Sequence, residues 1–193
     1  MYFCFKYKKL KIKNKKRNMR KEILFAIGIV AIALLSRFIP HPPNFTPILA
    51  IALFGGAIFK NKAIAYAVTL GSMFVADLFL GLHESLWAVY LCLALFVFIG
   101  TNVKRKNSKS ITLSAIASSV IFFLVTNFSV WAFTTLYSQN FSGLMTSYSM
   151  ALPFFKWNLL STLLYSGAIF GAYNLLEKYN FGFTKVVEEQ KSK

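Results

Sequence analysis

The chain has 193 residues, of which 56% are hydrophobic and 15% charged, against roughly 45–50% and 25% in soluble globular domains. This composition argues against a soluble protein. A formal net charge of +16 would ordinarily suggest nucleic-acid binding, but the charges lie in tails and short loops between long apolar runs. We therefore expect a lipid bilayer as the partner and no nucleic acid.

Residues suited to catalysis or metal binding are few. The chain has two cysteines, two histidines and six carboxylates, too few for a disulfide framework or a cysteine-ligated metal. His83-Glu84-Ser85-Leu86-Trp87 begins like a zinc-protease motif, but Trp87 stands where the second histidine ligand is needed. We expect no enzyme, no cofactor and no metal site.

Six apolar runs are read as transmembrane helices, because a hydrocarbon core of about 30 Å needs roughly 20 helical residues and open sheets cannot cross it. The predicted fold class is an all-α membrane protein, a six-transmembrane-helix bundle over residues 22–176. Basic tails flank it at residues 1–21 and 177–193. In chain order the predicted helices are Glu22–Ile39, Thr46–Phe59, Ala63–Leu82, Leu86–Asn102, Ile111–Tyr137 and Trp157–Leu176.

The distribution of Lys and Arg predicts that both termini lie in the cytoplasm, because cytoplasmic loops retain positive charge. One side of the predicted bundle receives 20 basic residues and the other only Arg37 and Lys156. The expected location is the bacterial inner membrane, with an even number of spans. Two alternatives concern the start: residues 1–18 as a misassigned extension before Met19, or a cleavable signal peptide that would leave five spans.

A proline-rich segment leads into the second predicted helix. It reads Pro40-His41-Pro42-Pro43-Asn44-Phe45-Thr46-Pro47, where the prolines enforce an extended or kinked path. Thr46 and Pro47 supply a cap and a first helical residue. Because the helix that follows is short, we read it as an interrupted helix of the kind that lines a binding site.

Polar residues inside the apolar runs converge on one depth. At about 1.5 Å per helical residue, Arg37 lies roughly 22 Å, Asp77 about 21 Å and Asn127 about 24 Å from the inner end of its span. Polar groups in a membrane usually face a cavity or a partner, so a ligand site in the outer third is predicted. Its candidate residues are Arg37, His41, Asn44, Thr46, Asp77, Asn127, Trp131 and Asn158.

Several of these residues also have a structural interpretation. Arg37 and Asp77 can form a buried ion pair that only holds the bundle together, Arg37 can instead snorkel to the outer interface, and His41 fits an ordinary loop residue. Asn127 and Trp131 are the better ligand candidates, since an amide and an indole one turn apart offer directional bonding and stacking. The sequence leaves these alternatives open.

Small residues recur at four-residue spacing in three of the predicted helices. Such faces let helix backbones approach closely, and we expect them to pack inside the bundle rather than to dock a partner protein. They are Ala63, Ala67 and Gly71, Ser114 and Ser118, and Gly167 and Gly171.

Five segments of the chain carry a resemblance to known proteins. They are SRFIPHPPNFTP at residues 36–47 with ALFGGA at 52–57, DL at 77–78, FFLVTNFSVWA at 122–132 and ALPFF at 151–155. Together they resemble a family of bacterial membrane proteins that are grouped as transport proteins of unknown function. The resemblance extends over about residues 19–173.

That family in turn resembles the substrate-binding S components of energy-coupling-factor transporters, which are six-helix proteins that capture vitamins from the outer side. The resemblance implies a substrate-binding subunit for uptake of a vitamin or related small micronutrient. Its implied partners are a transmembrane coupling protein and two ATPase subunits, since this chain has no phosphate-binding loop of its own. The alternatives are a structural or assembly membrane protein and a stand-alone ion-coupled carrier that uses Asp77.

Overall fold

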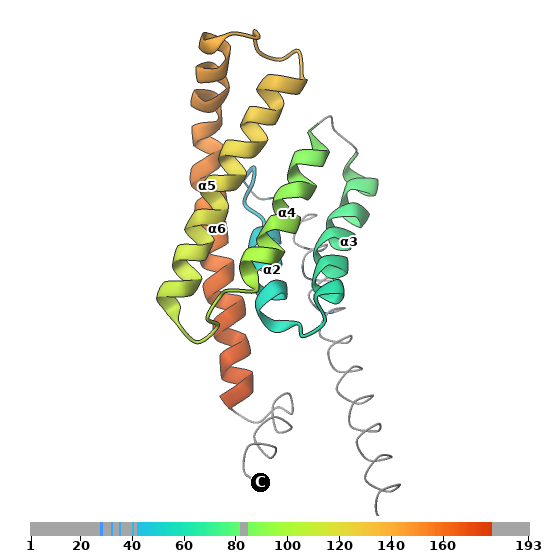
Figure 1. Ribbon diagram of the computed structural model, residues 1–193, viewed down its shortest axis with the longest axis vertical. Coiled ribbons are helices and arrows are strands. Elements are labelled where there is room, and N and C mark those ends of the chain that lie inside the picture. The colour runs from blue at the N-terminus through green and yellow to red at the C-terminus, as the bar shows by residue number, and fades with distance from the viewer. Residues whose placement is uncertain are drawn as a thin grey trace, which may run out of the picture.

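The computed structural model describes residues 42–81 and 85–178, together with Gly28, Ile32, Leu35 and Pro40. These residues hold five numbered α-helices and no strand, which confirms the all-helical expectation. The helices are α2 (Ile48–Ile58), α3 (Lys62–Leu80), α4 (Leu86–Gly100), α5 (Ser108–Phe133) and α6 (Phe141–Lys178) (Figure 1). Of the expected first span, only Gly28, Ile32 and Leu35 are described, all helical, and both tails lie outside the described residues.

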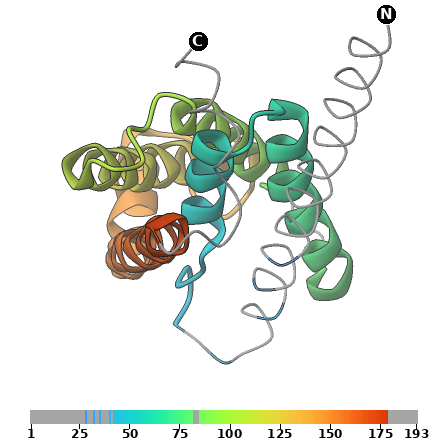
Figure 2. The same cartoon turned by 90° about the horizontal axis from the view of Figure 1, so that it is seen from below.

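The short helix α2 lies at the centre of the molecule. Its residues Ile48–Gly56 are all buried, and it contacts α3, α4, α5 and α6. Seen from below, α2 lies between α3 on one side and α5 and α6 on the other (Figure 2). Because α2 separates them, α3 makes no contact with α5 or α6.

Helices α2 and α4 cross with their backbones in direct contact, at Gly56 and Gly100. A Cβ atom on Gly56 would overlap the carbonyl oxygen of Val97 and lie 2.9 Å from the Cα of Gly100. A Cβ on Gly100 would overlap the carbonyl oxygen of Leu53. Only glycine fits at either position, so this crossing fixes the register of the two helices.

Lys62 stabilises the C-terminal end of α2. Its ammonium nitrogen donates to the carbonyl oxygens of Gly56 at 2.7 Å and Phe59 at 2.9 Å. A cation at a helix C-terminus interacts favourably with the helix dipole and with the carbonyls that lack intrahelical donors.

Replacing Lys62 with methionine keeps a long apolar side chain but removes this charge. We expect the free energy of unfolding to fall by about 1 kcal/mol, measured as a lower melting temperature in detergent. Lys60 belongs to the same turn and is exposed, so Lys60→Met is the matched control and should leave the melting temperature unchanged. Equal effects of the two substitutions would contradict a capping role for Lys62.

The segment between the fifth and sixth predicted helices is largely helical, which corrects the prediction that the last helix begins at Trp157. Helix α6 begins at Phe141 and continues through Pro153. Its first turn is held by Asn140, whose side-chain oxygen accepts from the Gly143 amide at 2.8 Å. A proline removes one helical hydrogen bond without ending every helix, and α6 is supported there by its long contact with α5.

The lengths of the helices differ from those of six full spans. Helix α2 has 11 residues and α4 has 15, fewer than the roughly 20 that cross a bilayer. Two helices, α5 and the Lys62–Phe79 part of α3, are long and apolar enough to cross a membrane by length and composition. The described residues therefore do not support a bundle of six full spans.

Candidate functional site

The proline-rich segment enters the interior of the molecule and ends at the N-terminus of α2. The Phe45 amide donates to the carbonyl of Pro42 at 3.0 Å, closing a turn, and Asn44 has a φ of 62°, a left-handed conformation that asparagine tolerates better than most residues. Pro47 occupies the cap position of α2, with no side-chain cap. The predicted cap residue Thr46 is half-buried and the helix begins one residue later than expected.

The N-terminal turn of α2 is buried and carries backbone donors. The first turn of any helix has amide groups without intrahelical acceptors, and the helix dipole places partial positive charge there. Here that turn comprises Ile48, Leu49 and Ala50, which are 7%, 1% and 0% exposed. A buried, electropositive helix end of this kind favours an anionic or electron-rich group.

One face of α6 holds the proline-rich segment against this end. The Phe45 ring lies 6.2 Å from the ring of Trp157 and 5.8 Å from that of Tyr165. The Ser161 hydroxyl lies 3.4 Å from the carbonyl oxygen of Asn44. Ser161 and Tyr165 were not among the predicted site residues. They lie three and seven residues after Asn158, a spacing that puts all three on one helix face and that could have identified them.

Asn158 lies on the same face and is 4% exposed. Its backbone carbonyl accepts from the hydroxyls of Ser161 at 2.9 Å and Thr162 at 2.8 Å. Its side-chain oxygen Oδ1, however, is buried and has no hydrogen-bond partner among the described residues. Buried amide oxygens are normally satisfied, so this atom is available to a donor that the described residues do not supply.

Asp77 lies on α3, away from that face of α6. Its side chain is 2% exposed, and its Oδ2 accepts from the hydroxyl of Tyr90 on α4 at 2.8 Å. Since α3 contacts neither α5 nor α6, Asp77 belongs to a separate polar contact between α3 and α4. Its expected partner Arg37, like His41, lies outside the described residues.

Asn127 and Trp131 belong to the upper part of the α5–α6 hairpin. The Asn127 amide donates to the carbonyl of Phe123 at 2.7 Å, on its own helix, and its backbone carbonyl accepts from the Ser147 hydroxyl at 3.1 Å. The Trp131 indole donates to the carbonyl of Ser138 at 3.1 Å, in the turn between the helices. The described contacts thus place the predicted residues in three groups, and their convergence on one ligand stays a prediction.

A cleft of about 160 Å³ opens between the first half of α5 and the last part of α6. None of the predicted site residues lines it. In the described ranges no three metal-ligating side chains gather in one place. The residues around the cleft are Ser108, Ile111, Thr112, Ala115, Leu163, Ser166, Gly167, Phe170, Gly171 and Asn174.

These observations define an all-helical protein with a short central helix, polar groups buried between helices, and two helices apolar enough to cross a membrane. The sequence model of a protein family, DUF6580, matches residues 17–186; the family is described as one of unknown function. The chain belongs to this family. No curated protein and no solved structure matches it.

Proposed function

We propose that the protein is a multi-pass inner-membrane protein, with both termini in the cytoplasm, that binds a small micronutrient such as a vitamin as the substrate-binding subunit of an uptake system. The observation that carries the proposal is the buried N-terminus of α2, which has no side-chain cap, near the α6 face of Asn158, whose Oδ1 has no hydrogen-bond partner among the described residues. The resemblance to S components supplies the substrate class and the proposed coupling protein and ATPase partners.

The distribution of polar and apolar side chains supports insertion in a bilayer. Along α5, the buried residues are Ala115, Ser118, Ser119 and Ser129. The exposed ones include Leu113, Ile116, Val120, Leu124 and Phe128. A helix of a soluble protein turns its apolar face inward, whereas a helix surrounded by lipid keeps small and polar residues for its helix contacts.

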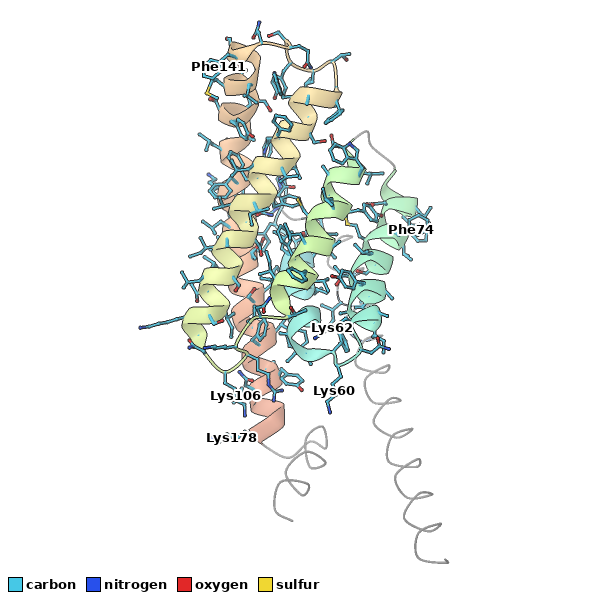
Figure 3. All side chains as sticks on the ribbon, viewed as in Figure 1. Lys60, Lys62, Phe74, Lys106, Phe141 and Lys178 are labelled. Atoms are coloured by element: carbon cyan, nitrogen blue, oxygen red, sulfur yellow. The ribbon has the colours of Figure 1, made fainter. Side chains whose placement is uncertain are left out.

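The positions of the cations support the orientation. Lys60, Lys62, Lys106 and Lys178 lie at the same end of the molecule, and Phe141 lies at the opposite end (Figure 3). Because cytoplasmic loops keep positive charge, the lysine end is the cytoplasmic one in this proposal. The proline-rich segment enters α2 from the other side, so a ligand would reach the α2 N-terminus from outside.

The test is a thermal-shift screen of vitamins and their precursors on the full chain purified in detergent. A ligand at 100 times its dissociation constant adds about 2.7 kcal/mol to the stability of the folded state, or roughly 5–10 °C for a chain of this length. We expect one compound to give a saturable shift. Asn158→Ala should abolish the shift, because it removes the free Oδ1 acceptor.

The same variant separates binding from folding. Removing a buried acceptor that has no partner among the described residues relieves its desolvation penalty, which offsets the cost of the lost side-chain volume, so unliganded Asn158→Ala should melt close to the parent temperature. Asn102→Ala, in the exposed loop after α4, is the matched control and should keep the shift. A shift that survives in Asn158→Ala would contradict this site. A folded sample that responds to no compound would favour the structural or assembly interpretation.

A further inference from the structure

The cleft between α5 and α6 lies at the basic end of the molecule and is not part of the proposed substrate site. It runs from Ser108 and Asn174 at the open end of the hairpin to Ala115 and Leu163 inside it, a length of about 10 Å along α5 and about 16 Å along α6 at 1.5 Å per helical residue. Ser108, Thr112, Gly167 and Gly171 are exposed. The cleft is therefore open to the surface that would face lipid.

Two glycines form the open side of the cleft. No described atom lies within 4 Å of a Cβ built on Gly167 or Gly171, so among the described residues nothing requires glycine at either position. Glycine inside a helix costs about 0.5–1 kcal/mol relative to alanine. The expectation that this pair packs inside the bundle does not hold for the described residues, and the space in front of it is free for another molecule.

The floor of the cleft presents polar atoms without partners. Ser166 is 1% exposed, and its hydroxyl has no hydrogen-bond partner among the described residues. The side-chain oxygen of Asn174 also has no hydrogen-bond partner among the described residues. The amide nitrogen of the same side chain donates to the carbonyl of Arg105 at 3.1 Å. Both residues line the cleft, so its occupant has hydrogen-bonding groups as well as apolar surface.

Basic residues flank the Ser108 end of the cleft and form its rim, although none of them lines the cleft itself. The loop before α5 and its first turn carry Lys104, Arg105, Lys106 and Lys109, with no acidic residue in that turn. Cations are disfavoured at a helix N-terminus, where the dipole is already positive. The loop is nevertheless ordered: the Lys104 amide donates to the Ser110 hydroxyl at 3.0 Å, and the Arg105 guanidinium donates to the Tyr173 hydroxyl at 3.3 Å.

We propose that this cleft binds one anionic phospholipid of the cytoplasmic leaflet. The phosphate lies at the basic rim beside Ser108 and Lys109, the glycerol ester groups meet Thr112 and Ser166, and the first acyl carbons lie on Ala115 and Leu163. This order follows the lining of the cleft from Ser108 and Asn174 at the basic end to Ala115 and Leu163 at the inner end. A second copy of the chain packed here would bring two basic rims together, and like charges repel.

The inference goes beyond the proposed transport function and rests only on its membrane insertion. The experiment measures lipid binding to the full chain in detergent, without any vitamin, by native mass spectrometry and by thermal shift. The probes are dioleoylphosphatidylglycerol, dioleoylphosphatidylcholine and inorganic phosphate. We expect one phosphatidylglycerol per chain and a rise in melting temperature, with neither effect from phosphatidylcholine or inorganic phosphate.

Two variants locate the lipid. Gly171→Leu should place apolar atoms in the cleft, since an added Cβ there has no described atom within 4 Å, and should reduce phosphatidylglycerol binding at least about fivefold. Lys109→Gln should weaken binding about fivefold through loss of one cation near the phosphate. The matched controls are Ala172→Leu, at the exposed neighbour that does not line the cleft, and Lys60→Gln, an exposed lysine of the same end. Both controls should bind like the parent.

Equal binding of both lipids, or the full effect from inorganic phosphate alone, would overturn the proposal. Unchanged phosphatidylglycerol binding in both Gly171→Leu and Lys109→Gln would overturn it as well. So would a dimer that Gly171→Leu converts to a monomer while lipid binding persists. If Gly171→Leu does not fold, Lys109→Gln against Lys60→Gln decides alone. A chain that stays in solution without detergent would defeat membrane insertion and hence both proposals. A chain that needs detergent but shows no lipid preference defeats only this one.

Discussion

Replacing Gly56 with alanine is expected to reduce the yield of folded protein sharply and to lower the free energy of unfolding by about 3 kcal/mol or more. The added Cβ overlaps the Val97 carbonyl oxygen and meets the Gly100 Cα at 2.9 Å. These are backbone atoms of α4, so no side-chain rotation can relieve the overlap. The two central helices must move apart, and the buried surface of α2 loses its packing.

The sign of this effect distinguishes a helix crossing from helix propensity. In a helix that nothing approaches, glycine to alanine raises stability by about 0.5–1 kcal/mol. Gly167 has no described atom within 4 Å of an added Cβ, so Gly167→Ala is the matched control and should melt at or above the parent temperature. Gly100→Ala should behave like Gly56→Ala. Equal melting temperatures for Gly56→Ala and Gly167→Ala would contradict the crossing of α2 and α4.

The sequence predicted the long apolar helices within a few residues but not the partners of each helix. Helix α3 begins at Lys62 and α5 at Ser108, close to the expected Ala63 and Ile111, because each is a single apolar run after a polar loop. The close contact between Gly56 and Gly100, where α2 and α4 cross, was not predicted. Spacing within one helix identifies small-residue faces, whereas Gly56 and Gly100 lie on different helices and their contact depends on the tertiary fold.

The start of α6 could not be read from hydropathy. Residues 141–156 mix hydroxyls with apolar residues and include Pro153, a pattern typical of a connecting loop. The structure makes them helical because α5 provides a long partner: Tyr148 donates to the Leu124 carbonyl at 3.0 Å, and the Phe123 and Phe155 rings lie 4.8 Å apart. Such tertiary contacts override local propensity.

The candidate site was predicted by depth, and depth alone could not group its residues. Asp77, Asn127 and Asn158 have similar expected heights, but α2 lies between α3 and the α5–α6 hairpin. Depth is a one-dimensional coordinate, so residues at one height can face different neighbours. Lateral position requires the packing order of the helices, which the sequence does not contain.

Replacing Asp77 with alanine is expected to be the most destabilising change of a predicted site residue, at about 3–5 kcal/mol if Arg37 is its counter-charge, as the sequence predicts. The carboxylate is 2% exposed and accepts from the Tyr90 hydroxyl at 2.8 Å. Asp77→Ala would leave the guanidinium without its carboxylate, and Arg37→Ala would leave the buried Asp77 carboxylate without its cation, so Arg37→Ala should cost a similar amount. The expected loss in melting temperature is at least about 6 °C for each single variant, measured in detergent without ligand.

The double variant Arg37→Ala/Asp77→Ala tests the pairing, because it leaves neither charge stranded. It should be more stable than the sum of the two single losses predicts, by about 1–3 kcal/mol. Tyr90→Phe removes only the neutral donor and should cost about 1.5–3 kcal/mol, the range for a hydrogen bond to a charged group. Additive losses would mean that Arg37 and Asp77 act apart, and Arg37 would then be free to meet a ligand or the outer interface. Strong coupling would instead mean that the pair stabilises the fold. Ligand recognition would then involve α2 and the Asn158 face of α6.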